Sequence, residues 1–442
     1  MFQAPTLWGL LPLIIFVFLA FRNRHPVVAI SIAIVVGAIM SGESLVGVGS
    51  SIRDGLSSFL GYIGLIILAG AGLGKITEKT GAAANLVRFI MVKVKVNTPT
   101  KAIIGTMICS TLLSGLLGTL AGANAVLAPV IIPIVAAAGL SPSVVAIIFQ
   151  GAGTTGLFLG PFTPPMVTLM ELTGLSYTQV LFSASIPLAV IVWIVTFFYS
   201  KKVLAKTMLE QPYSSNDIIE LNNEENDSSD EERKVKRKRA TQATWTFVIT
   251  LLSLIFYGVI IEGGSTFAIM IILITSITTG LAGRLSLNEI VETFFEGAKP
   301  LVWLFFQFVL FTPFIYYIEK LGGFEALANL LMPLVESGGK TALLNMITIL
   351  GVAGIPGASV AQMTILNEMF HGVISEMSIP MTVWVMVLLV GSQMTEYLYP
   401  VGDTLGAMGI ARSKDLKRMI IFGIVATAAA LVLVFVYTLI RS

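Results

Sequence analysis

Long runs of apolar residues, separated by short polar segments, form the main pattern of this chain. Five such runs are Leu7–Ala20, Val27–Met40, Val180–Tyr199, Trp245–Ile261 and Met419–Ile440. Each approaches the roughly 20 residues that an α-helix needs to cross a bilayer. The pattern predicts an all-α polytopic membrane protein with little folded structure outside the bilayer.

Composition agrees with this prediction. Of the 442 residues, 55% are hydrophobic and 12% are charged, whereas a soluble domain has about 25% charged residues. The first apolar run is followed by Arg22 and Arg24 and preceded by no basic residue, so we expect it to remain as a span and not to be removed as a signal peptide. The single cysteine, Cys109, permits no internal disulfide.

One polar segment divides the chain nearly in half. Residues 201–242 hold an Asn/Ser/Asp/Glu-rich stretch followed by the basic run Arg233–Arg239. Such a composition is typical of a solvated, disordered linker. We therefore predict a first transmembrane repeat at 1–200, a charged linker at 201–242 and a second transmembrane repeat at 243–442.

Short motifs recur in the same order on both sides of the linker, which indicates an internal duplication. The recurring pairs are Asp54-Gly55 with Glu296-Gly297, Glu78–Gly81 with Glu319–Gly322, Asn85 with Asn329, Gly122-Ala123 with Gly357-Ala358, and Pro142 with Pro380. Each pair alone is weak because Gly and Ala are abundant here. The conserved order over most of each half makes the duplication the better interpretation.

Apolar segments of the first half predict five crossings, near residues 6–21, 26–41, 57–75, 143–170 and 179–200. The further segment 101–138 is interrupted by glycines and ends with two prolines. We interpret it as a re-entrant hairpin, which a membrane tolerates where the hairpin is buried in protein or lines water. Since five is odd, the second half would be inverted, giving two inverted repeats of five helices, each with a hairpin and a broken helix.

The basic residues predict the orientation of these spans. Most of them fall on one predicted face, within residues 22–25, 75–101, 201–239, 284–299 and 412–418. The face with the excess of Lys and Arg is normally cytoplasmic. We expect a multi-pass protein of the cell membrane with a cytoplasmic linker and with both termini extracytoplasmic.

Four breaks in the apolar pattern are candidate binding segments: residues 118–124, 151–165, 354–359 and 391–404. In transporters with inverted repeats, broken helices expose backbone groups to a substrate or an ion near mid-membrane. In the second of these breaks, the hydroxyls of Thr154, Thr155 and Thr163 are potential ligands for an oxyanion or a cation. The alternative is a proline kink whose threonines bond to their own helix.

The last break carries two carboxylates. Glu396 lies inside a predicted span, where a charge is costly and usually functional. The alternative is a neutral glutamic acid bonded between helices. Asp403 is either a structural cap or a cation ligand. At or just past the hairpin tips, Asn124 and Ser359 are candidate substrate ligands, although both residue types also cap helices.

Several functional motifs are missing from the sequence. No phosphate-binding loop of the Walker A type occurs, so ATP-driven transport would need a partner. Metal-ligand clusters and a serine nucleophile elbow are absent too. We therefore expect no enzyme, no cofactor apart from a coupling H⁺ or Na⁺, and no nucleic-acid partner.

The chain resembles the gluconate permease family of the ion transporter superfamily, which also holds citrate, dicarboxylate and sodium/proton antiporter families. The resemblance rests on Gly70–Lys75 with Thr80–Ala83, Leu127–Pro133, Gly156–Pro165 and Glu396–Ile410. It implies inverted repeats, re-entrant hairpins, cation-coupled elevator-like transport of anions and a homodimer. A sugar acid would need many hydrogen-bonding side chains. A less hydroxylated carboxylate therefore fits the threonine-lined break at 151–165 better.

These observations predict a secondary active transporter that carries a small organic anion, coupled to H⁺ or Na⁺ by alternating access. Glu396 and Asp403 would handle the coupling ion. The predicted substrate-binding residues are Asn124, Thr154, Thr155, Thr163, Ser359, Ser392, Gln393 and Thr395. The alternative is a sodium/proton antiporter without an organic substrate. Duplicated broken helices argue against a receptor, and the lack of a charged ring argues against a channel.

Overall fold

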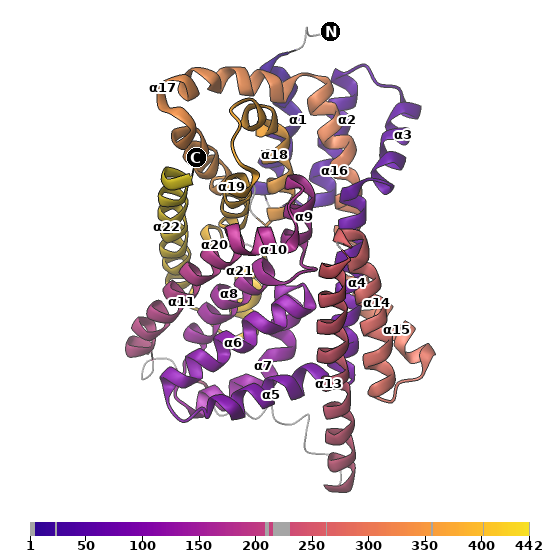
Figure 1. Ribbon diagram of the computed structural model, residues 1–442, viewed down its shortest axis with the longest axis vertical. Helices are drawn as coiled ribbons and strands as arrows, with labels where there is room; N and C mark the ends of the chain where they lie inside the picture. The colour runs from indigo at the N-terminus through magenta and orange to yellow at the C-terminus, as the bar shows by residue number, and fades with distance from the viewer. Residues whose placement is uncertain are drawn as a thin grey trace.

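The computed structural model describes residues 5–22, 24–207, 212–214, 230–261, 263–354, 357–400 and 402–441. Regular structure in these residues is helical, without strands. Figure 1 shows α1 (Leu11–Phe21) and the last turn of α22 (Leu416–Arg441) in the upper half of the molecule, whereas the ends of α11 (Ile186–Thr207) and α13 (Asp230–Ile260) that flank the linker lie in the lower half. The predicted linker therefore begins and ends as helix, and its residues 208–211 and 215–229 lie outside the described residues.

The helices of the first half follow the apolar pattern. After the 3₁₀ turn Leu7–Leu10 they are α1 (Leu11–Phe21), α2 (Pro26–Met40), α3 (Leu45–Leu56), α4 (Phe59–Lys79), α5 (Ala82–Val94), α6 (Pro99–Leu117), α7 (Leu120–Ala137), α8 (Pro142–Leu159), α9 (Pro164–Thr173), α10 (Tyr177–Val180) and α11, the last two joined by the π-helical turn Leu181–Ser185. Prolines open α2, α6, α8 and α9, where the missing N–H has no intrahelical partner in any case.

The second half holds ten α-helices among the described residues. After α13 come α14 (Gly264–Ala282), α15 (Leu287–Ala298), a 3₁₀ turn (Lys299–Leu301), α16 (Val302–Lys320), α17 (Gly323–Val352), α18 (Ser359–Glu376), α19 (Met381–Gln393), α20 (Thr395–Leu398), α21 (Gly402–Ile410) and α22 (Leu416–Arg441). α17 bends at Gly339, where φ is 69°. The opposite orientation of the halves stays a prediction.

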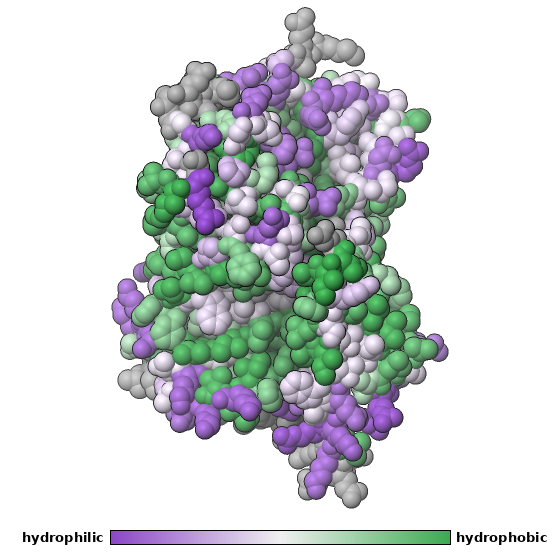
Figure 2. All heavy atoms as spheres, in the orientation of Figure 1, coloured by the Kyte–Doolittle hydropathy of each residue, from purple (hydrophilic) through white to green (hydrophobic). Residues whose placement is uncertain are grey.

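The polytopic all-α class is confirmed. Nine helical segments among the described residues are long and apolar enough to cross a membrane, and four shorter apolar helices accompany them. Figure 2 shows hydrophobic atoms over the middle of the molecule and hydrophilic atoms mostly at its two ends. The predicted count of ten spans stays a prediction.

The helices form two groups, and each half contributes to both. In the first group, α4 packs against α14, α15 and α16, and α16 packs against α2 and α3. In the second group, α11 packs against α22, α8 against α21, and α9 against both α18 and α19. Helices that are distant in sequence thus share each group, and the hairpins and broken helices belong to the second.

The segment predicted as the first hairpin is a helix, a tight turn and a returning helix. The turn lies at Gly118, whose φ of 70° favours glycine because it has no Cβ. α6 and α7 pack against each other along the hairpin. The second hairpin is formed by the last part of α17 and by α18, which also pack together.

A buried polar junction joins α6, α8 and α11. The indole N–H of Trp193 donates to Thr111 Oγ1 and Thr155 Oγ1, both at 3.0 Å, and Thr111 Oγ1 donates to the carbonyl of Ala152 at 2.7 Å. We expect Trp193→Phe to lower the free energy of unfolding by about 1–2 kcal/mol, since it leaves two partly buried hydroxyls without their donor. Thermal unfolding in detergent measures this, with Trp245→Phe at a half-exposed site on α13 as the control; equal melting temperatures would contradict it.

Candidate functional site

A cavity of about 760 Å³ lies where the two hairpins and the two broken helices meet. The hairpin tips contribute residues 117–122 and 357–361. The break between α8 and α9 contributes Pro164 and Pro165, and the break between α20 and α21 contributes Glu396, Gly402 and Asp403. All four breaks seen in the sequence therefore reach one cavity.

Four helices begin at this cavity. Its lining includes the first residues of α7, α9, α18 and α21, which are Leu120, Pro164, Ser359 and Gly402. Helix N-termini carry a partial positive charge and unpaired N–H groups, and so they attract anions. α9 opens with two prolines, so the free N–H donors come chiefly from the other three helices.

Glu396 and Asp403 bring two carboxyl groups to the same cavity. Glu396 is only 6% exposed, and Ser359 lies next to its carboxyl group. This contact joins the second hairpin tip to the second broken helix. Within the described part of the chain, no Lys or Arg forms an ion pair with either acid. A buried carboxyl without a basic partner needs a proton or a bound cation.

A cluster of three charged side chains from α4 and α15 also lines this cavity. Lys75 Nζ is 2.9 Å from Glu78 Oε1 and 3.7 Å from Glu296 Oε1. These side chains are partly exposed, and Lys75 is the one basic residue among the described residues that line the cavity. Lys75 is not among the residues predicted for the site, although its position at the end of the glycine-rich run Gly70–Lys75 was a signal for it.

The three threonines predicted in the break at 151–165 do not line the cavity. Their hydroxyls donate to carbonyls of the same segment: Thr154 to Gln150 at 2.6 Å, Thr155 to Ala152 at 2.6 Å, and Thr163 to Leu157 at 2.6 Å. This is the alternative considered for a proline kink. Their contact with a substrate stays a prediction.

Of the remaining predicted substrate ligands, one lines the cavity and four do not. Ser359 lines the cavity, whereas Asn124, Ser392, Gln393 and Thr395 are buried away from it. Ser392 donates to the carbonyl of Leu388 at 2.7 Å, and Thr395 to that of Ser392 at 2.6 Å. The structure thus gathers Ser359, Glu396 and Asp403 from the predicted set.

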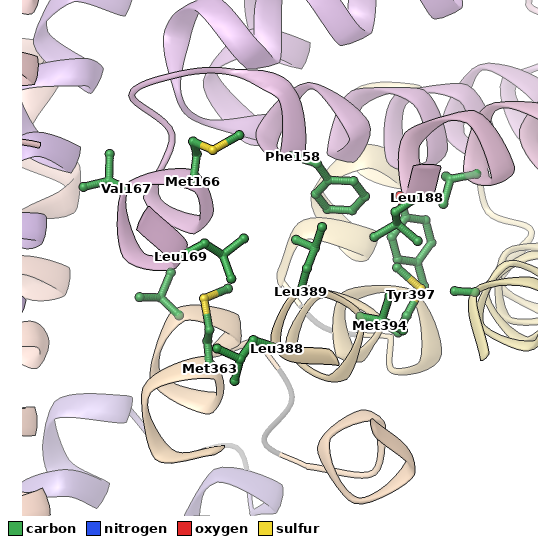
Figure 3. Packing of buried hydrophobic residues seen from close by; sticks show 14 of the residues in the cluster. Phe158, Met166, Val167, Leu169, Leu188, Met363, Leu388, Leu389, Met394 and Tyr397 are labelled. Atoms are coloured by element: carbon green, nitrogen blue, oxygen red, sulfur yellow. The ribbon is translucent and has the colours of Figure 1, made fainter. Parts of the chain in front are cut away.

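Apolar packing fixes the two broken helices relative to each other. Figure 3 shows Leu169 of α9 close to Met363 of α18 and Leu388 of α19. In the same view Phe158 of α8 faces Leu389 of α19. All five side chains are buried. The first broken helix therefore packs on the second hairpin and on the second broken helix.

A second cavity, of about 870 Å³, lies beside the same break. Pro161 and Phe162 line it, together with the α9–α10 segment and with apolar residues of α13 and α14. Pro164 and Pro165, only a few residues further on, line the first cavity. The break between α8 and α9 thus contributes residues to both cavities.

Helix groups shared between two halves, with hairpin tips and broken helices meeting around an interior cavity, define a membrane transporter fold. The sequence profile of the family described as Citrate transporter (CitMHS) matches residues 13–292, more than half of the chain. The chain belongs to this family of secondary transporters. The predicted membership in the ion transporter superfamily is confirmed, through one of the families that the resemblance included.

Two solved transporters share the fold at low sequence identity. MtrF of Neisseria gonorrhoeae, described among antimetabolite efflux pumps, is similar with a TM-score of 0.56 and 15% identity, over 94% of this chain and 95% of MtrF. The YdaH transporter of Alcanivorax borkumensis, described as having an unusual topology, gives a TM-score of 0.52 and 13% identity, over 89% of this chain and 88% of YdaH. A comparison with curated protein sequences gave no match.

Proposed function

We propose that this protein carries a small carboxylate, such as citrate, across the membrane together with H⁺ or Na⁺. The observation that carries the proposal is the cavity at which four helix N-termini meet two carboxyl groups that have no ion-pair partner among the described residues. The N-termini provide an attractive field and N–H donors for an anion. The carboxyl groups provide sites for a cation or a proton.

The charges around the cavity explain why the anion would need a cation. The lining holds the carboxyl groups of Glu78, Glu296, Glu396 and Asp403 and the single ammonium group of Lys75. Ionised carboxylates would repel an entering anion at short range. Protonation or cation binding at Glu396 and Asp403 reduces that repulsion, so ion binding and anion binding favour each other.

Two cavities that are lined by neighbouring residues of one break support alternating access. We propose that the second helix group, which contains the hairpins and broken helices, moves against the first group in an elevator-like manner. Pro161 and Phe162 would then separate the substrate from the second cavity. In this proposal the linker is cytoplasmic and the transporter is a homodimer.

A sodium/proton antiporter is the second candidate. It is favoured by Glu396 and Asp403, which lie at one cavity without a basic partner among the described residues. In that case the two acids would exchange Na⁺ and H⁺, and the helix N-termini would have no anionic ligand.

Uptake into liposomes tests the proposal. We expect radiolabelled citrate, or another small di- or tricarboxylate, to accumulate when an inward H⁺ or Na⁺ gradient is imposed and to stop accumulating when the gradient is collapsed. Gluconate represents the sugar acids and should accumulate less than citrate. Protein-free liposomes measure the background uptake. Na⁺/H⁺ exchange without uptake of any carboxylate would overturn the proposal in favour of the antiporter.

A further inference from the structure

The backbone carbonyl of Glu396 lacks its normal helical partner. It lies in the single-turn helix α20, and the residue four positions later, whose N–H would complete the next helical bond, is Pro400. Proline has no N–H to donate. A buried carbonyl without a donor is costly, so another group must satisfy it.

Two side chains supply the missing donors. Gln150 Nε2 donates to the Glu396 carbonyl at 2.9 Å, and Thr404 Oγ1 donates to the same oxygen at 2.9 Å. Gln150 is 1% exposed and belongs to α8 in the other half of the chain. Its Oε1 is buried without a hydrogen-bond partner, so the bond to Glu396 is the contact that accounts for the position of its amide.

A second bond runs in the opposite direction between the same two helices. Tyr397 Oη donates to the carbonyl of Gly151 at 3.0 Å. Adjacent residues of α8, Gln150 and Gly151, are therefore bonded to adjacent residues of α20, Glu396 and Tyr397. A Cβ at Gly151 would lie 2.3 Å from Thr196 Oγ1, so little space is left around this pair of bonds.

We propose that Gln150 is a positioning residue that links the first broken helix to the cation site at Glu396. By holding the Glu396 carbonyl it fixes the backbone from which the Glu396 carboxyl group extends into the cavity. α8 runs from Gln150 toward the break before Pro164 and Pro165, which line the same cavity. A shift of the Glu396 backbone on cation binding is therefore transmitted through Gln150 and α8 to these two prolines. This inference rests on the proposed cation coupling at Glu396.

Isosteric substitutions test this link. Gln150→Met keeps the length of the side chain and removes the donor, and we expect it to raise or lower the half-saturating concentration of the coupling cation three- to tenfold. The half-saturating carboxylate concentration at saturating cation should change less than twofold. Thr404→Val, which loses its hydroxyl, should act in the same direction, and Thr404→Ser, which keeps it, should resemble the wild type.

Asn345→Leu is the matched control. The amide of Asn345 also bridges two helices, donating to Thr438 Oγ1 of α22 at 2.9 Å. Its loss should lower thermal stability without changing the dependence on the cation. A Gln150→Met protein with wild-type cation dependence, or with cation and carboxylate constants changed equally, would overturn the proposal.

A readout without carboxylate separates this inference from the proposed function. Thermal stabilisation of the purified protein by Na⁺ or by H⁺ measures cation binding directly. If the wild type transports no carboxylate and its cation-dependent stabilisation still changes in Gln150→Met, the positioning role stands and the substrate proposal fails. If Gln150→Met does not fold, the Thr404→Val and Thr404→Ser pair decides, and identical cation dependence in the two would overturn the proposal.

Discussion

Replacing Glu396 by glutamine should reduce gradient-driven carboxylate uptake by roughly 100-fold or more, equivalent to about 2.7 kcal/mol. The substitution keeps the size of the side chain and its reach to Ser359, but it removes the group that binds and releases a proton or a cation. Gradient-driven uptake into liposomes measures the effect. Glu325→Gln, at an exposed position of α17, is the control and should leave uptake unchanged.

The same variant distinguishes the two coupling ions. Glutamine resembles a permanently protonated glutamic acid, so a proton-coupled carrier should lose net uptake and still exchange labelled for unlabelled carboxylate without a gradient. A Na⁺-coupled carrier should lose both activities, because the neutral amide is a poorer ligand for Na⁺ than a carboxylate. Full gradient-driven uptake by Glu396→Gln would contradict a coupling role for this residue.

The sequence was sufficient to predict the class of fold and the segments that form the site. The apolar runs are long enough to require a bilayer, and no soluble fold would accommodate them. Gly and Pro interrupt helices for local steric reasons. The breaks were therefore visible in the sequence, and each of them reaches the cavity.

Which side chains face the cavity could not be predicted in the same way. Thr154 and Thr163 lie in the predicted break, but a threonine hydroxyl can donate to a carbonyl of its own helix, and this bond depends on the rotamer and not on sequence position. The contact between Gln150 and Glu396 joins residues 246 positions apart. Such a contact follows from the packing of the two halves.

The position of Lys75 shows the same limit of sequence patterns. Its span was predicted, yet its place beside Glu296 depends on α4 packing against α15 of the other half. Each helix group combines elements of both halves, so the charges around the cavity are brought together only by the tertiary fold. A repeat detected in sequence indicates which segments correspond, and not which of them come into contact.

Substitution of Gly423 by alanine should disrupt the packing of α22 against α20, the short helix that carries Glu396. A Cβ at this position of α22 would lie 1.8 Å from the carbonyl oxygen of Tyr397, which is backbone and cannot rotate away. Overpacking of this kind typically costs about 1–3 kcal/mol. We expect a lower melting temperature in detergent and, because Tyr397 adjoins Glu396, weaker stabilisation by the coupling cation.

Gly372→Ala provides the matched control for Gly423→Ala. Gly372 also lies inside a long helix, α18, but a Cβ there would meet no atom within 4 Å. Alanine is preferred over glycine in a helix interior by about 0.5–1 kcal/mol, so this variant should melt at the same temperature as the wild type or slightly higher. If Gly423→Ala behaved like Gly372→Ala, the close approach of α22 to α20, and with it the rigid placement of Glu396, would be contradicted.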